Sequence, residues 1–142
     1  MTRTPSDPHS GLTDRQRQVV ETLRPDRIGH GILAARDPEL MRALHDAEIV
    51  LEICPTSNLL TRALRDEDAV RDTFRAFVDH GVAFTIATDG PEMMRTHLRD
   101  ELELLKRIGA LDDDELAEAN RHGHQASFVH AEAARSASPS RT

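Results

Sequence analysis

Three short polar segments hold the side chains that could carry out chemistry. His30 stands between two glycines, Ser57 and Asn58 follow a Cys-Pro-Thr run, and Asp89 precedes a Gly-Pro pair. An aspartate can bind a metal ion or accept a proton, and a histidine can polarise a bound water. Taken alone, each segment is more typical of a turn or a helix start than of a site. Together they predict a site if the fold brings them to one place.

Each of these segments lies at or just after the carboxyl end of a short run of residues that predicts a β-strand. The runs cover residues 27–31, 49–54 and 82–87, and glycine or proline residues bound them. The second and third runs are largely apolar, which is typical of buried strands in a parallel sheet. Because the carboxyl ends of parallel strands meet at one rim, we expect the histidine, the hydroxyl-amide pair and the aspartate to converge there.

Helices with one apolar face are predicted between and after the strands. They cover residues 13–23, a segment from 37 onward, and residues 66–80, 93–108 and 112–129. Thr13, Asp37 and Asp112 are the expected N-caps of the first, second and last of them. Strands that alternate with helices predict parallel pairing through right-handed crossovers, and therefore an α/β fold.

The folded part of the chain is expected to span residues 13–130. Residues 1–12 are rich in Pro, Ser and Thr and predict a disordered lead-in, and residues 131–142 predict a flexible tail. The chain has 142 residues, whereas a closed eight-stranded β/α barrel needs at least about 200. Three β/α units therefore predict an open α/β layer or a piece of a barrel.

Charge, hydropathy and cysteine content limit the kinds of binding partner and the cellular compartment that the sequence predicts. Lys and Arg number 18 against 25 Asp and Glu, so the net charge is −7, which argues against nucleic acid as a partner. No apolar run reaches the roughly 20 residues that a membrane span needs. Cys54 is the single cysteine, and one thiol cannot form an internal disulfide. These features predict a cytoplasmic protein that binds a small molecule rather than a membrane.

The motifs RIGHG, EICPTSN and TDGP, in this order, resemble the C-terminal segment of the adenosine deaminase family. The resemblance runs from about Val20 to about Val129. It implies a partial TIM (β/α)8 barrel that comprises the last three β/α units and the C-terminal helices. It also implies zinc or a similar divalent metal at the rim, and hydrolytic removal of the 6-amino group of a purine nucleoside.

The resemblance also assigns roles to individual residues. His30 matches the histidine beside the metal-bound water, and Asp89 matches the aspartate that binds the metal and contacts the same water. Gly31, Ser57 and Gly90 fall on positions that shape the substrate pocket. Gly90 stands where the family usually has a second aspartate that accepts a hydrogen bond from the purine ring. Adenosine, adenine and modified purines therefore all remain open as substrates.

The other ligands of the family's metal have no counterpart in this sequence. The family supplies a His-x-His pair and a third metal histidine from earlier strands, together with a nearby glutamate that acts as a proton shuttle. Asp89 is the one matched ligand here. We therefore expect a truncated or split member that binds zinc weakly and is inactive alone. The His122-Gly123-His124 pair does not replace these ligands, because residues two apart on a helix diverge by about 200°. We expect both histidines of this pair to lie on a solvated helix surface.

Two classes of function follow from these expectations. In the first, the chain is a truncated deaminase. Either a complementing N-terminal half-barrel chain or a second copy completes it, or it is an inactive remnant without a partner. Exposed strand edges and an apolar inner face would favour such an assembly. In the second, the chain is a non-catalytic α/β module that binds a nucleoside-like ligand or a partner chain at the same rim.

Overall fold

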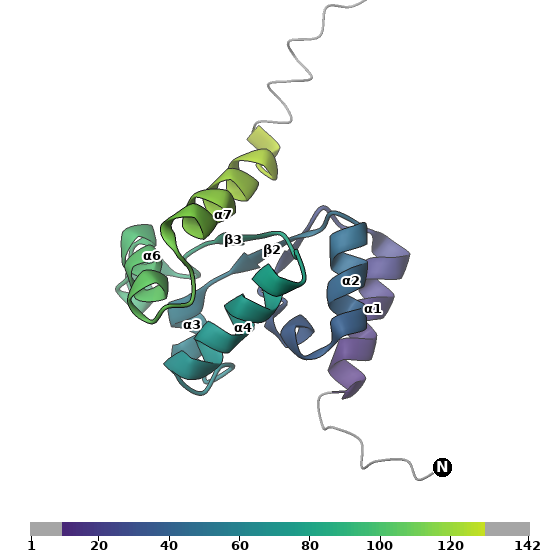
Figure 1. Cartoon of the computed structure of the whole chain (residues 1–142), viewed down its shortest axis with the longest axis horizontal. Helices are drawn as coiled ribbons and strands as arrows, with labels where there is room; N and C mark the ends of the chain where they lie inside the picture. The colour runs from purple at the N-terminus through teal and green to yellow at the C-terminus, as the bar shows by residue number, and fades with distance from the viewer. Residues whose placement is uncertain (1–9, 130–142) are drawn as a thin grey trace, which may run out of the picture.

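The computed structural model describes residues 10–129, so most of the predicted lead-in and the whole predicted tail lie outside the described residues (Figure 1). Three parallel strands pair in the order β1-β2-β3. The strands are β1 (Arg27–Gly29), β2 (Val50–Ile53) and β3 (Phe84–Ile86). The helices are α1 (Ser10–Leu23), η1 (Ile32–Arg36, a 3-10 helix), α2 (Pro38–Asp46), α3 (Pro55–Leu60), α4 (Glu67–Asp79), α5 (Pro91–Met94), α6 (Leu98–Arg107) and α7 (Asp113–Gln125).

The sheet confirms the predicted α/β class and the three strand positions. Ile28 is in register with Leu51, and Leu51 with Phe84, so the strands begin and end at nearly the same level. Helix α2 connects β1 to β2, and α4 connects β2 to β3. All three carboxyl ends therefore lie at one edge of the sheet, as parallel pairing requires.

The apolar face of the sheet packs against the helices that connect the strands. Leu51 and Ile53 are fully buried, and Phe84 is in edge-to-face contact with Phe74 of α4, with ring centroids 5.3 Å apart. Burying a side chain of this size stabilises the fold by roughly 1.5–3 kcal/mol. This packing holds the strands, and hence the residues that follow them, in a fixed arrangement.

The opposite face of the sheet is polar where an apolar inner face was expected. Arg27 Nη1 and Glu52 Oε1 form an ion pair at 2.9 Å on this face. Thr85, which alternates with Phe84 along β3, meets α7 at Gly123. Helix α7 therefore covers the side of the sheet opposite α4, and Figure 1 shows the two helices on either side of β3. The expectation of an apolar inner face is wrong at these positions.

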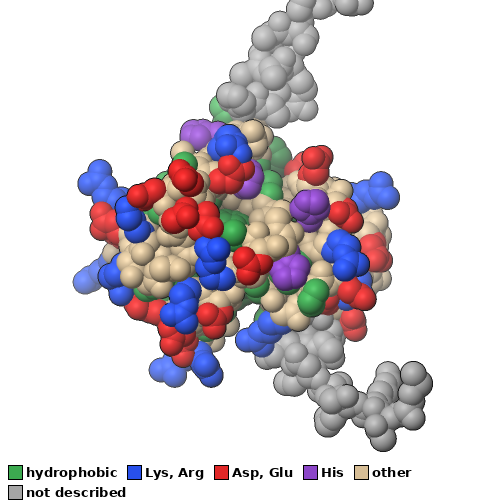
Figure 2. All heavy atoms as spheres, viewed as in Figure 1, with side chains coloured by type: hydrophobic (Ala, Val, Ile, Leu, Met, Phe, Trp, Pro, Cys, Tyr) green, Lys and Arg blue, Asp and Glu red, His purple; other side chains and the backbone are tan. Residues whose placement is uncertain are grey.

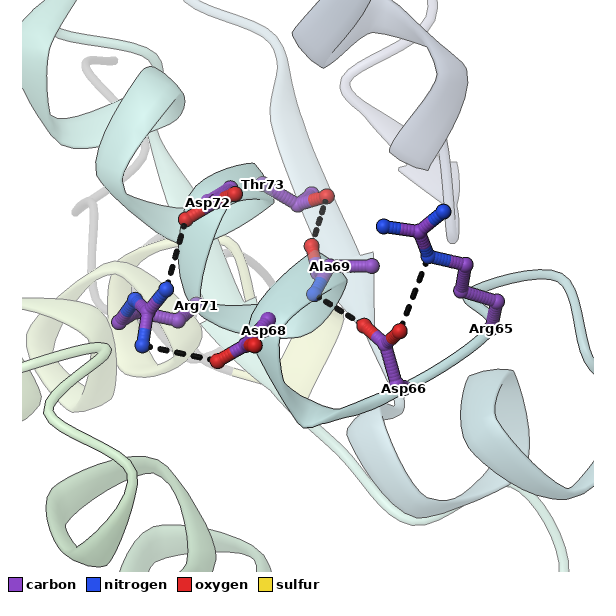
Figure 3. Close-up of polar contacts among 7 residues, drawn as sticks. All are labelled: Arg65, Asp66, Asp68, Ala69, Arg71, Asp72 and Thr73. Atoms are coloured by element: carbon purple, nitrogen blue, oxygen red, sulfur yellow. Dashed lines mark hydrogen bonds and ion pairs between the residues drawn. The ribbon is translucent and has the colours of Figure 1, made fainter.

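Polar caps fix where several of the helices begin. Asp37 accepts hydrogen bonds from the backbone N–H of two residues in the first turn of α2, and Asp112 forms a capping box with Glu115 at the start of α7. Both predicted caps are confirmed. Asp66 caps α4 in the same way, since its Oδ1 lies 2.8 Å from the N of Ala69 (Figure 3).

Three helix boundaries differ from prediction. Helical backbone already begins at Ser10, so Thr13 lies within α1 and is not its N-cap. The predicted helix over 93–108 is two helices, because Arg95 takes a left-handed conformation with φ 50° and ends α5. Helix α7 ends at Gln125 rather than near Val129.

Helix α3 was not predicted, since the residues of CPTSN read as a turn. Its first residue is Pro55, which suits the first helical position because its missing N–H has no intrahelical partner to lose.

The charged side chains and the hydropathy of the helices bear on the predicted partners. Acidic and basic side chains are interspersed on the face that Figure 2 shows. None of the helices within residues 10–129 has both the length and the hydropathy needed to cross a membrane.

Candidate functional site

His30 lies directly after β1 in a strained turn. Its backbone N donates a hydrogen bond to the carbonyl of Glu52 at 2.7 Å, and its φ is 58°. Gly31 continues the turn with φ 70°, and a Cβ there would lie 2.8 Å from Leu51 Cδ2. The left-handed backbone and the contact with Leu51 both require glycine at this position. Core packing thus explains Gly31, and its contact with a substrate stays a prediction.

Helix α3 carries two buried polar side chains toward the predicted histidine and aspartate. Ser57 and Asn58 are each 3% exposed. Ser57 Oγ donates to Asp89 Oδ2 at 2.8 Å, and Asn58 Oδ1 lies 3.0 Å from His30 Nδ1. Ser57 therefore orients the aspartate, and its predicted contact with a substrate remains untested.

These contacts bring His30 and Asp89 together from the ends of β1 and β3. His30 Nε2 lies 3.9 Å from Asp89 Oδ2, and the two side chains are 42% and 49% exposed. Both line an open hollow of about 550 Å³ at the carboxyl edge of the sheet. An imidazole and a carboxylate in this arrangement can orient one water molecule and accept a proton from it.

Two polar atoms at the same hollow are buried without a protein partner. Among residues 10–129, neither Asn58 Nδ2 nor Gln16 Oε1 makes a hydrogen bond. Both residues line the hollow. Because buried polar atoms normally have a partner, Asn58 Nδ2 is an unmet donor and Gln16 Oε1 an unmet acceptor beside the hollow.

Gly90 follows Asp89 but does not line the hollow. It precedes the first residue of α5 with φ −140°, a conformation open to any residue. A Cβ on Gly90 would lie 3.7 Å from Met93 Cβ, which is an ordinary contact. Neither conformation nor space therefore requires glycine here, and the predicted role of Gly90 in substrate binding stays a prediction.

Cys54 is not a nucleophile in this site. It is 6% exposed. Burial raises the pKa of the Cys54 thiol to about 11, and the charges of Asp89, Glu101 and Glu52 act in the same direction. The reactive species of cysteine is the thiolate, so a thiol with this pKa is inert near neutral pH.

The described residues do not complete a zinc site. No group of three or more His, Cys, Asp or Glu side chains lies close enough to hold a metal ion within residues 10–129. A catalytic zinc takes about three protein ligands and one water. Asp89 and its neighbour His30 are fewer than that, so the metal chemistry implied by the resemblance needs ligands from elsewhere.

The histidine pair of α7 is not a metal site either. His122 Nδ1 lies 3.1 Å from the carbonyl oxygen of Phe84, which can only accept, so the ring nitrogen donates. The side chain of His122 is 23% exposed, and the prediction of a solvated surface is wrong for it. His124 is exposed as predicted.

Sequence reasoning missed two residues that support the site. Asn58 was taken as part of a pocket-shaping segment, and its contact with His30 spans 28 residues. Glu101 is fully buried and accepts a hydrogen bond from the backbone N of Thr56 in α3. Its place between Leu98 and Leu105, on the apolar side of a predicted helix, was the available signal.

Comparison with known proteins finds one family over nearly the whole chain. The family model described as Adenosine deaminase matches residues 7–138. The aminodeoxyfutalosine deaminase of Streptomyces coelicolor is 42% identical over 131 residues, which cover 89% of this chain and 33% of that protein. The adenine deaminase of Rhizobium rhizogenes is 38% identical over 111 residues, which cover 78% of this chain and 34% of that protein.

A solved structure shows the same fold. The adenine deaminase of Arthrobacter aurescens superposes with a TM-score of 0.73 at 22% identity, over 86% of this chain and 37% of that one. At this identity the likeness concerns the fold. The chain spans about a third of the length of the curated relatives that it matches.

Proposed function

Because the chain belongs to the adenosine deaminase family, we propose that it forms part of an enzyme that removes the amino group of a purine by hydrolysis. The observation that carries the proposal is the approach of His30 Nε2 to Asp89 Oδ2, 3.9 Å apart at an open hollow. The two residues lie 59 positions apart by their numbers, and the sheet brings them together. If His30 and Asp89 served only to stabilise the fold, their side chains would not need to line an open hollow.

The substrate is a purine base or a purine nucleoside that carries an exocyclic amine. The names of the relatives specify adenine, adenosine and aminodeoxyfutalosine as substrates. These compounds differ in the substituent on the amine-bearing purine ring. The reaction consumes one water and releases one ammonia, and the ring carbon exchanges a C–N bond for a C–O bond. Gly90 offers no polar side chain to the ring, so discrimination among these substrates rests on other contacts.

His30 and Asp89 act on the attacking water. With Asn58 accepting from Nδ1, the Nε2 of His30 presents a lone pair to the hollow. Asp89 Oδ2, held by Ser57, presents a carboxylate oxygen to the same space. Two acceptors on one water fix its orientation and favour loss of its proton as the C–O bond forms.

The zinc that the family resemblance implies would take Asp89 as one ligand. The remaining ligands, and the rest of the barrel, would come from residues outside this sequence, on the same polypeptide or on another chain. The outer edge of β1 is a suitable place for such a chain to pair, since within the described residues β1 pairs with β2 alone.

A non-catalytic binding module is the second candidate function. The incomplete ligand set among residues 10–129 favours it for the chain taken alone. The hollow lined by His30, Asn58 and Asp89 would then hold a nucleoside-like ligand that is not converted.

A chimeric protein distinguishes these candidates. This chain would replace the matched third of the Streptomyces coelicolor aminodeoxyfutalosine deaminase. Ammonia release would be measured with adenine, adenosine and aminodeoxyfutalosine. We expect turnover that falls about 100-fold or more in Asp89→Ala and in His30→Ala.

Asp26→Ala is the matched control, because Asp26 is exposed at the other end of β1. Unchanged turnover in Asp89→Ala would refute the proposal. A folded chimera that binds a purine without turnover would favour the binding module.

A further inference from the structure

A buried carboxylate away from the His30–Asp89 pair joins α6 to α3. Glu101, in the first turn of α6, is 0% exposed. Its Oε2 accepts a hydrogen bond from the backbone N of Thr56 at 3.0 Å, and its Oε1 accepts one from Thr96 Oγ1 at 3.3 Å. Burying an acidic side chain is unfavourable unless such bonds compensate for the lost water. Both oxygens of Glu101 are therefore committed to holding neighbouring segments.

The bond to Thr56 supplies a cap that α3 lacks locally. Thr56 is the second residue of α3, and the N–H groups of a first helical turn have no acceptor within the helix. Cys54, at the N-cap position, provides no side-chain hydrogen bond. Glu101 provides it from 45 residues further along the chain. Because the acceptor belongs to α6, the bond also fixes α3 relative to a second helix.

The position of α3 decides how the site residues are held. The two residues after Thr56 are Ser57 and Asn58, which contact Asp89 and His30 at 2.8 and 3.0 Å. Hydrogen bonds of this kind have little tolerance, since their usual range ends near about 3.2 Å. A small shift of α3 would therefore release both contacts together.

We propose that Glu101 is a positioning residue that sets the geometry of the His30–Asp89 pair through α3. It touches neither residue of the pair, and it acts through Thr56, Ser57 and Asn58. The claim that this positioning serves a reaction rests on the proposed function. The coupling of Glu101 to the geometry of His30 and Asp89 through α3 does not depend on it.

Two substitutions separate the reach of the side chain from its charge. Glu101→Gln keeps the length and an acceptor oxygen for Thr56, and Glu101→Asp keeps the carboxylate on a side chain one methylene shorter. Nuclear magnetic resonance of the full chain would report the ring nitrogens of His30 and the side-chain amide of Asn58. We expect both sets of signals to move in Glu101→Asp and to stay near their parental positions in Glu101→Gln. Exchange of the Thr56 amide should be about tenfold faster or more in Glu101→Asp.

Glu103→Asp is the matched control, because Glu103 is exposed on the same helix. Thr56→Pro removes the donor from the opposite partner and should move the same signals. The proposal is overturned if folded Glu101→Asp or Thr56→Pro leaves the His30 and Asn58 signals unchanged. It is also overturned if Glu101→Gln moves them as far as Glu101→Asp, or if both Glu101→Asp and Thr56→Pro unfold, which would make Glu101 purely structural.

In the chimera, Glu101→Asp should lower kcat while Glu101→Gln retains it. A chimera that is inactive with its parental sequence would refute the proposed function, and the resonance result would still decide the coupling.

Discussion

His30 Nδ1 lies 3.0 Å from Asn58 Oδ1, and this contact determines which ring nitrogen faces the hollow. A carbonyl oxygen can only accept, so Nδ1 carries the proton and Nε2 is left with its lone pair. Nε2 is the nitrogen that lies 3.9 Å from Asp89 Oδ2. A buried amide thus selects the form of His30 that can accept a proton from water.

Replacing Asn58 by leucine should reverse this selection. Leucine offers no acceptor to Nδ1, so we expect His30 to place its proton on Nε2 in most molecules. The nitrogen chemical shifts of the His30 ring, measured at a pH where the ring is neutral, distinguish the two forms. Asn120→Leu is the control, since Asn120 is exposed on α7. Retention of the Nδ1–H form in Asn58→Leu would contradict the assignment.

Cys54 should resist thiol reagents in the folded protein. Burial and nearby carboxylates raise the pKa of its thiol to about 11, so at pH 8 only about one molecule in a thousand carries a thiolate. Cys54 is the single cysteine, so labelling reports this site alone. We expect labelling to be slow in buffer and to approach the rate of a free thiol in denaturing urea. Equal rates in both would show that the thiol is accessible and its pKa normal.

The raised pKa of Cys54 also predicts a pH dependence of stability. The folded state favours the neutral thiol, so its contribution is complete below the unfolded pKa of about 8.5 and is lost as the pH rises toward 11. Cys54→Ala should weaken the decline of the free energy of unfolding over this range.

Sequence patterns predicted those parts of the fold that local interactions determine. Strands β2 and β3 follow from short apolar runs, and β1 follows from a short run bounded by proline and glycine. The caps at Asp37 and Asp112 follow from bonds that reach three residues or fewer along the chain. The site pair His30 and Asp89 followed from its place at strand ends, and the structure brings the two side chains together.

The features that were missed depend on contacts between distant segments. Helix α3 is capped by Glu101 from 45 residues away, so its own six residues read as a turn. His122 bonds to Phe84 across 38 residues, which a helical pattern on its own face does not reveal. The break at Arg95 is a change of backbone conformation at a residue that favours helices in general.

Asp37 should make stability depend on pH in the acid range. Burial raises the pKa of its carboxyl, but hydrogen bonds from the backbone N–H of Leu40 and from Arg17 outweigh burial, and the pKa lies below its usual range. The folded state therefore favours the charged form. Its contribution to stability is present above the unfolded pKa of about 3.9 and is lost as the pH falls through the lower folded value.

Asp37→Asn isolates the charge, because asparagine still caps a helix but cannot pair with Arg17. We expect the free energy of unfolding at pH 7 to fall by roughly 0.5–1 kcal/mol, and the difference from the parent to shrink below about pH 4. Denaturant unfolding over a pH series measures both. A constant difference between Asp37→Asn and the parent at all pH values would argue against the ion pair with Arg17.

We expect the fold to require glycine at position 123, although this position lies inside helix α7, where alanine is normally favoured. Alanine normally stabilises a helix interior by about 1 kcal/mol relative to glycine. Here a Cβ on Gly123 would lie 2.5 Å from Thr85 Oγ1 and 3.4 Å from Thr85 Cβ, so either the Thr85 side chain must rotate or α7 must move away from β3. A movement of α7 would also strain the bond between His122 and the carbonyl of Phe84. We therefore expect Gly123→Ala to lower the free energy of unfolding.

A double-mutant cycle with Thr85 tests the cause of this loss. Thr85→Ala removes the hydroxyl that the new Cβ would meet, so Gly123→Ala should be tolerated in that background and should even stabilise α7. Gly29→Ala is the control, since a Cβ on Gly29 would meet no atom within 4 Å. Equal effects of Gly123→Ala with threonine and with alanine at position 85 would mean that α7 does not pack on β3 as described. The placement of α7 over the polar face of the sheet would then be wrong, and that face would be open to a partner.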